Sequence, residues 1–253
     1  MCVFSFGQQK PSMSKFEVNY LVKFRADTAS THVMLQEYVS LLIGDEESLF
    51  KSTQKAIYDS LTLAEVDRSN KAAKNEYVKI DLSQIPTAKF KPEVFKKGIA
   101  LTGYNELLKT VYAYPIEEKI IWKILNETKT IQKYKCRKAI GKYKNREYIA
   151  WFSEEIPFSE GPYVFKGLPG LIVEVYDTKN YYHFDLIGFK KVEKPIIPSQ
   201  PQIQTEYSKF VKARENFLAD PNGVFESQTR FKIPAKDRDR LAKMHQSNNN
   251  FID

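Results

Sequence analysis

Few residues of this chain could perform chemistry, and they are spread along it. Cys136 is a thiol within a basic stretch, and Arg146, Glu155 and Asp177 follow it at irregular spacing. A nucleophile, a cation and two carboxylates form an active site only where the fold brings them into one cleft. An enzyme or maturation factor that uses such a cleft is therefore an alternative, but the sequence predicts no catalytic residue.

The sequence predicts no metal site and no cofactor. The three histidines, His32, His183 and His245, lack the spacing of metal ligands. The glycine-rich stretch 161–172 fits neither a phosphate-binding loop nor a dinucleotide fingerprint. We therefore expect a protein that works without a bound ion or coenzyme.

Cys136 is predicted to be buried and structural. In a strand its side chain lies on the same face as Tyr134 and Ile140, whereas Lys133 and Lys135 take the other face. Positive neighbours would lower the pKa of an exposed thiol. The apolar side favours a buried thiol that reacts slowly.

Residues 119–148 form a basic segment. They contain ten Lys or Arg and only two carboxylates, Glu127 and Glu147, so their net charge of +8 equals that of the whole chain. Such a segment could attract an anionic partner. A surface-interaction protein that acts through this basic face is a second alternative, although a solvated strand face is the simpler interpretation.

Residues 1–10 resemble the remnant of a signal peptide, with an apolar run followed by small residues. This pattern predicts export to the periplasm or cell envelope, where nucleic acid is not an expected partner. No run approaches the roughly 18 apolar residues that a membrane-spanning helix needs. The sequence therefore predicts no transmembrane span.

Alternating apolar and polar residues predict a chain built mainly from strands. Residues 15–25 are the clearest case, because Phe16, Val18 and Tyr20 would share one face. Aromatic residues, which favour strands, make up 13% of the chain. Further strands are expected at 33–43, 77–82, 107–114, 119–125, 131–140, 147–152, 171–176 and 181–190.

Two segments, 53–65 and 206–218, have helical spacing with one apolar stripe each. A polar loop is expected at 67–75, and Pro221-Asn222-Gly223 is interpreted as a helix stop. The predicted fold class is α+β, mainly antiparallel β, with a curved sheet or half-barrel and a few packed helices.

Residues 161–172 concentrate the residues that shape a backbone. Glycine permits unusual φ angles or close approach, and proline fixes φ. We expect a shaped structural turn that leads into the strand at 171–176. The glycines and prolines are Gly161, Pro162, Gly167, Pro169 and Gly170.

These residues resemble the GLPGLI family, whose motif stands intact at Gly167–Ile172. The stretches Tyr134–Ala139 and Arg146–Phe152 resemble the family's preceding strands, and Asp177 closes the next strand as in its pattern. The resemblance implies an exported bacterial protein with no assigned reaction, so no catalytic role transfers. The positions that it singles out are Cys136, Arg146, Trp151, Pro157, Gly161, Pro162, Gly167, Leu168, Pro169, Gly170, Leu171, Ile172 and Asp177.

The chain is expected to have three parts. Residues 1–10 are the signal-peptide remnant, 11–192 a β-rich GLPGLI-type domain, and 193–253 a Pro-rich connector with a C-terminal helical extension that frays near residues 248–250. The leading hypothesis is a non-enzymatic envelope protein that binds an apolar or extended ligand or a protein partner.

The strand at 147–152 is apolar on both faces, so it needs two covers. Helices 53–65 and 206–218 could lie over the sheet and leave an apolar cavity lined by Phe and Tyr. If these helices pack down fully, the protein would instead work through its surface.

Overall fold

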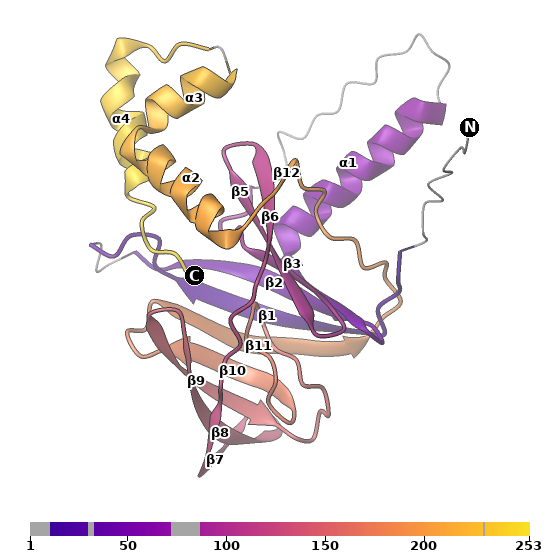
Figure 1. Ribbon diagram of the computed structural model, residues 1–253. Helices are drawn as coiled ribbons and strands as arrows, with labels where there is room; N and C mark the ends of the chain where they lie inside the picture. The colour runs from indigo at the N-terminus through magenta and orange to yellow at the C-terminus, as the bar shows by residue number, and fades with distance from the viewer. Residues whose placement is uncertain (1–10, 30–32, 72–86, 230) are drawn as a thin grey trace.

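One sheet runs through the computed structural model, which describes residues 11–29, 33–71, 87–229 and 231–253 (Figure 1). In this described part the sheet has twelve strands in the order β12-β6-β5-β4-β3-β2-β1-β11-β10-β9-β8-β7, and only the β12–β6 pair is parallel. The strands are β1 (Phe16–Phe24), β2 (Leu35–Ile43), β3 (Glu47–Ser52), β4 (Glu93–Lys97), β5 (Ala100–Leu107), β6 (Thr110–Pro115), β7 (Lys123–Ile131), β8 (Tyr134–Tyr143), β9 (Arg146–Ser153), β10 (Leu171–Asp177), β11 (Tyr182–Lys191) and β12 (Ile203–Gln204). The helices are α1 (Thr53–Lys71), α2 (Tyr207–Ala219), α3 (Pro221–Thr229) and α4 (Ala235–Gln246).

The centre of the sheet has two distinct faces. One cross-strand row places Val22, Phe184, Val175 and Ala150 on the same side, and all four are fully buried. We call this side the covered face. The next row lies on the other side, the polar face, and consists of Leu21, Asp185, Glu174, Trp151 and Lys138.

The sheet curls strongly at its β7 end. Lys129 of β7 forms an ion pair with Glu174 of β10, although β8 and β9 lie between these strands. The side-chain amide of Gln132 also reaches the carbonyl of Leu186 in β11. The predicted α+β class with a curved sheet is therefore confirmed, and the described strands leave the sheet open between β7 and β12.

The loop between β9 and β10, residues 154–170, lies over the covered face, and we call it the cap loop. Tyr163, Phe165 and Leu168 of this loop are almost completely buried. The ring of Phe165 packs against Tyr148 and Phe184, with centroids 4.6 and 5.9 Å apart. The glycine- and proline-rich stretch thus supplies part of the hydrophobic core.

The helices do not cover β9, contrary to the expected lid. Helix α1 packs against β2 and β3, and α2 packs against β6. Figure 1 shows α1 projecting from the sheet on one side and α2–α4 grouped on the other. The cap loop covers one face of β9, because Phe165 packs on Tyr148 there. On the polar face, Lys129 lies 4.3 Å over the ring of Trp151.

Some predicted boundaries are wrong, for local reasons. Helix α1 begins where expected because the Ser52 hydroxyl accepts a hydrogen bond from Lys55 N, but it continues to Lys71, into the loop predicted at 67–75. The supposed stop at 221–223 is a helix start. Asp220 accepts a hydrogen bond from Gly223 N, and Pro221 takes the first position of α3.

Three further predictions need a correction or fall outside the described residues. The strand expected at 119–125 begins only at Lys123, and the indole N–H of the preceding Trp122 donates a hydrogen bond to the carbonyl of Lys166 in the cap loop at 2.9 Å. The strand expected at 77–82 and the signal-like residues 1–10 lie outside the described residues. Export therefore stays a prediction. None of the described helices combines the length and apolar character that crossing a bilayer requires.

Candidate functional site

The four residues of the enzyme alternative do not meet. Cys136 and Glu155 lie at one end of the β8–β9 hairpin, where Glu155 accepts a hydrogen bond from Lys135 N. Arg146 and Asp177 form an ion pair at the other end, 3.6 Å apart. Seven residues of β8 separate these ends, which corresponds to roughly 23 Å of strand.

The prediction that Cys136 is buried is confirmed. Its side chain has no exposed surface, and its thiol lies 3.4 Å from the carbonyl oxygen of Tyr134. Burial raises the pKa of the Cys136 thiol to about 11. Because the thiolate is the reactive form, Cys136 has the properties of a structural residue.

The motif glycines are required by geometry. A Cβ at Gly170 would lie 2.2 Å from the carbonyl oxygen of Ser153, and a Cβ at Gly161 would lie 2.3 Å from that of Phe165. Gly167 has φ +93°, which disfavours other residues. Leu168, Leu171, Ile172 and Pro162 are buried around them, and Pro169 is exposed.

A buried ion cluster that the sequence did not reveal anchors the cap loop. Glu160 pairs with Lys166 within the loop and with Lys96 of β4 at 2.7 Å, and it accepts a hydrogen bond from Ser48. Burial alone would raise the pKa of Glu160, but the two lysines outweigh it and lower the pKa. The cluster therefore fixes the loop to β3 and β4.

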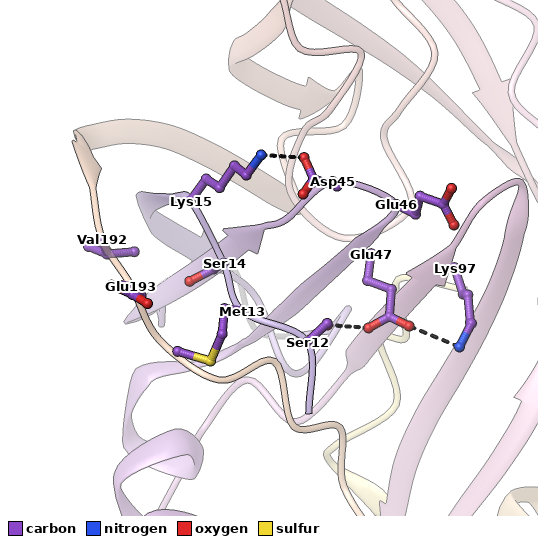
Figure 2. A pocket seen from close by; sticks show the side chains of 10 residues that line it. All are labelled: Ser12, Met13, Ser14, Lys15, Asp45, Glu46, Glu47, Lys97, Val192 and Glu193. Atoms are coloured by element: carbon purple, nitrogen blue, oxygen red, sulfur yellow. Dashed lines mark hydrogen bonds and ion pairs between the residues drawn. The ribbon is translucent and has the colours of Figure 1, made fainter. Parts of the chain in front are cut away.

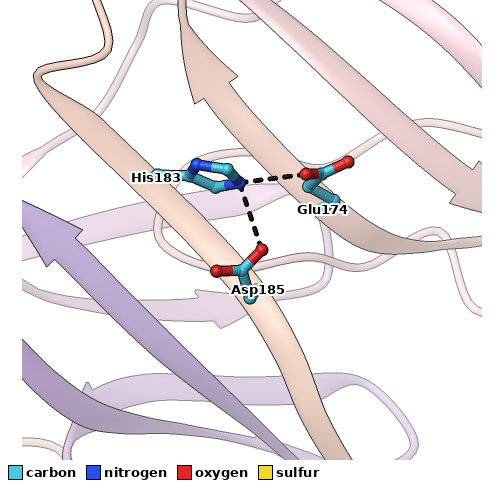
Figure 3. A group of neighbouring side chains, drawn as sticks. All are labelled: Glu174, His183 and Asp185. Carbon is cyan, nitrogen blue, oxygen red and sulfur yellow. Dashed lines mark hydrogen bonds and ion pairs between the residues drawn. The ribbon is translucent and has the colours of Figure 1, made fainter. Parts of the chain in front are cut away.

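Three potential metal ligands meet on the polar face, as Figure 3 shows. His183 Nε2 lies 3.0 Å from Glu174 Oε1 and 3.1 Å from Asp185 Oδ1. Lys129 also pairs with Glu174, and Lys23 pairs with Asp185 at 2.9 Å. Both carboxylates thus already have cationic partners.

Binding of a metal by this cluster would require His183 to lose a proton. Burial would lower the pKa of His183, but hydrogen bonds to Asp185 and Glu174 raise it to about 9. A protonated imidazole has no lone pair for a metal. The sequence did contain a signal for the cluster, because a hairpin of the strands predicted at 171–176 and 181–190 would place Glu174, His183 and Asp185 on one face. The structure pairs Glu174 with Asp185.

A polar groove lies where β1 begins (Figure 2), with a cavity volume of about 670 Å³. Glu47 is hydrogen-bonded to Ser12 and pairs with Lys97 at 3.0 Å, and both contacts lower the pKa of Glu47. Lys15 pairs with Asp45. An adjoining pocket of about 420 Å³ is lined in part by Pro157. Glu47 and Asp45 are thus both paired with lysines, and Glu46 and Glu193 also line the groove.

The basic segment is less basic in space than in sequence. Half of its ten cations form ion pairs, most of them with carboxylates from outside residues 119–148. These neighbours reduce the charge that a partner would meet. The pairs are Lys129–Glu174, Arg137–Glu154, Lys138–Glu127, Lys144–Glu118 and Arg146–Asp177.

Residues 248–253 bind to the covered face as an irregular segment, which we call the docked segment. Side chains of β9 and β11 donate hydrogen bonds to three of its successive main-chain carbonyls. The pairs are Tyr182 Oη to Asn250 O at 2.5 Å, Arg146 Nη2 to Phe251 O at 3.0 Å, and Tyr148 Oη to Ile252 O at 3.4 Å. Helix α4 ends at Gln246, just before the stretch where fraying was expected, but residues 248–250 are held in place and are not loose.

The donors of this docking site keep their protons. Burial raises the pKa of Tyr148 and of Tyr182, and the opposing effect of Arg146 is smaller. Both phenols therefore stay neutral over the physiological range and donate. Arg146 is held in place by Asp177, whose other carboxylate oxygen accepts a hydrogen bond from Tyr182 N at 2.6 Å.

Helix α2 completes the docking site with Arg214. Its guanidinium carbon lies 3.8 Å from the ring centroid of Phe251, and its Nη1 lies 2.7 Å from Asp253 Oδ1. Ile252, between these two residues, is 2% exposed and belongs to the hydrophobic core. Burial would lower the pKa of Arg214, but Asp253 outweighs it and raises the pKa.

The docked segment is also attached to the end of β1. Asn250 N donates a hydrogen bond to the carbonyl of Ala26 at 3.0 Å, and its side-chain amide donates to Arg25 O at 2.6 Å. Asn249 accepts a hydrogen bond from Thr28 N. The docking site therefore combines β1, β9, β11 and α2, which are far apart in the sequence.

Comparison with known proteins gives one family model and one similar fold. Residues 140–174 match a model described as a protein of unknown function (Porph_ging), and these residues span the end of β8, all of β9, the cap loop and the start of β10. Two solved structures, of PNGF-II in C2 and P21 space groups, match with TM-scores of 0.50 and identities of 11% and 12%. No curated protein matches the chain.

The likeness to PNGF-II shows the fold alone. The match covers 79% of this chain but 32–33% of PNGF-II, so the chain spans about a third of the length of that protein.

The family comparison corrects the assignment made from the motif. The matching model is Porph_ging, so the predicted membership of the GLPGLI family, and the name given to residues 11–192, are wrong.

Proposed function

We propose that this chain is a non-enzymatic binding protein that holds an extended polypeptide segment of a partner at the docking site. The observation that carries the proposal is the row of three donors, from Tyr182, Arg146 and Tyr148, on three successive main-chain carbonyls. Every peptide offers such carbonyls, so the row can capture main chain. The docked segment is the resident occupant of the site.

The strength of the site follows from its contacts. Each neutral hydrogen bond contributes about 0.5–1.5 kcal/mol net, and one to a charged group contributes somewhat more. Burial of an Ile side chain adds about 1.5–3 kcal/mol. A tethered segment acts at an effective concentration on the order of millimolar. A partner would therefore compete with the docked segment, and the unmodified chain would bind it weakly.

The edge strand β7 is a less suitable place for a partner. Its outer edge could add a strand, but it carries Lys123 and Lys129 and has an irregular register between Ile124 and Thr128. Lysines and bulges are features that keep edge strands from pairing. The docking site, with aligned donors, supports binding better.

The test uses the full chain carrying Ile252→Glu, which releases the docked segment because a carboxylate cannot occupy the apolar site of Ile252. A labelled, acetylated and amidated peptide with the wild-type sequence of residues 248–253 is added, and fluorescence anisotropy is followed. We expect saturable binding by this variant and much weaker binding by the unmodified chain.

Two further variants identify the site. Tyr182→Phe, added to Ile252→Glu, removes one hydroxyl and should weaken peptide binding by about two- to tenfold. Tyr176→Phe is the matched control, because Tyr176 lies on β10 beside His183 of the polar face, and it should leave binding unchanged. Absence of saturable binding by a variant with an intact circular dichroism spectrum would refute the proposal.

A further inference from the structure

The docked segment presents its side chains to opposite sides in turn. Phe251 and Asp253 both meet Arg214, whereas Ile252 enters the core of the sheet. This alternation is that of an extended chain, in which residues i and i+2 share one side. One arginine of α2 therefore contacts two residues of the occupant at once.

From this geometry, and resting on the proposed function, we infer that the docking site selects a peptide with an aromatic residue, then an aliphatic residue, then an acidic residue. Arg214 contacts the side chains at the first and third of these positions. A planar guanidinium can stack on an aromatic ring while its N–H groups bind a carboxylate. Lysine offers a point charge and cannot do both in the same way.

The surroundings of Arg214 support a built recognition site. The exposed fractions of the Arg214 and Asp253 side chains are 13% and 4%, so solvent screens their interaction little. The guanidinium also lies 5.4 Å from the ring of Phe210, one turn earlier in α2. Tyr114 of β6 lies 3.5 Å from the second carboxylate oxygen of Asp253.

The pocket for the middle residue excludes charge. Ile252 is 2% exposed and lies in the core cluster with Tyr148 and Tyr182. A charged side chain there would lose its water without gaining a partner. The expected ligand class is thus a protein segment with the pattern aromatic, aliphatic, acidic, and with main-chain carbonyls free to accept hydrogen bonds.

The experiment compares peptides on the full-length Ile252→Glu variant. The parent peptide carries the sequence of residues 248–253. A second peptide replaces the residue equivalent to Asp253 with Asn, a third replaces that equivalent to Phe251 with Leu, and a control replaces that equivalent to Asn248 with Gln. We expect the Asn peptide to bind at least about tenfold more weakly, because a charge-assisted hydrogen bond is lost. The Leu peptide should bind several-fold more weakly, and the control peptide like the parent.

Adding Arg214→Gln makes the test specific. With this change the parent and Asn peptides should bind equally, which a double-mutant cycle would show as coupling between Arg214 and the acidic position. If the Ile252→Glu variant, which keeps Arg214, bound all of the peptides equally, the inference would be overturned and the proposed function would still stand. Binding of no peptide would instead overturn the proposed function.

A second measurement applies if Ile252→Glu does not fold. The unmodified chain is mixed with peptides in which benzoylphenylalanine replaces the aromatic residue, and the photo-cross-linked residues are mapped. We expect cross-links to α2 near Arg214 that the parent peptide displaces more effectively than the Asn peptide. Cross-links elsewhere, or equal displacement by both peptides, would contradict the inferred selectivity.

Discussion

Two irregular segments lie on the covered face and meet at Tyr148. The cap loop packs Phe165 against the ring of Tyr148, and the docked segment accepts a hydrogen bond from its hydroxyl at the carbonyl of Ile252. The cap loop is held by several buried rings and by glycines in contact with neighbouring backbone. The docked segment is held by hydrogen bonds, by Arg146 and Arg214, and by one buried aliphatic residue. The cap loop contributes several rings to the core, whereas the docked segment contributes Ile252 alone.

The sharpest test of this difference is Phe165→Ala. Removing a ring with no exposed surface should lower the free energy of unfolding by about 3–5 kcal/mol, because a cavity forms in the core. Urea denaturation followed by circular dichroism measures the change. Phe231→Ala is the control, since Phe231 is 73% exposed and its removal should cost less than about 0.5 kcal/mol. A loss below about 1 kcal/mol in the free energy of unfolding for Phe165→Ala would show that the cap loop is not part of the core.

The next largest effect is expected for Gly170→Ala. The new Cβ would collide with the carbonyl oxygen of Ser153, so the loop must shift and the free energy of unfolding should fall by about 1–3 kcal/mol. Gly188→Ala is the matched control, because a Cβ there meets Asn19 at an ordinary 3.7 Å. Equal denaturation midpoints for the two variants would show that the loop adapts and is not held by its backbone.

A smaller loss is expected for Ile252→Ala in the docked segment, although Ile252 is as buried as the cap residues. If the segment leaves its site while the sheet stays folded, as the proposed function requires, the loss cannot exceed the free energy of docking, and we expect about 1 kcal/mol. Ile121→Ala, at a residue that is 88% exposed, is the control. A loss as large as that for Phe165→Ala would mean that both segments belong equally to the core.

The smallest effect concerns the polar face, which carries neither segment. Hydrogen bonds to two carboxylates outweigh burial and raise the pKa of His183 from 6.5 to about 9. Because the folded-state pKa is raised, this stabilisation is complete below about pH 6.5 and disappears as the pH rises through 9. His183→Gln should therefore cost about 1 kcal/mol at pH 6, limited by partial exposure, and less at pH 9.5. A cost independent of pH would exclude the charged imidazole as its cause.

The sequence predicts β1, β2, β9, β10 and β11 well, because their burial follows from alternation. It misses β4, and the strand expected at 107–114 crosses the turn between β5 and β6. Residues 15–25, for example, become β1 with Val18 and Tyr20 fully buried. Strand β3 escapes prediction because it buries polar residues, including Lys51, whose partners Asp59 and Glu93 come from other elements.

The docking site was not predictable for a related reason. Residues 248–250 are three asparagines, a composition typical of a loose end. They are fixed by contacts with residues distant in the sequence, such as the hydrogen bond that the Asn250 side-chain amide donates to Arg25 O. Arg146 and Asp177 were singled out from the sequence, but their roles become visible only in the fold. Arg146 donates a hydrogen bond to the carbonyl of Phe251, and Asp177 holds the Arg146 side chain in place.

The position of β1 has a consequence for the synthesis of the chain. Its neighbour β2 follows directly, but its other neighbour, β11, begins only at Tyr182. At about 5–20 residues per second, a ribosome needs on the order of ten seconds to reach that strand. During this interval the β1–β2 hairpin has one unpaired edge with Val18, Tyr20 and Val22 uncovered. Chaperones that shield strand edges therefore have a defined interval in which to act on this nascent chain.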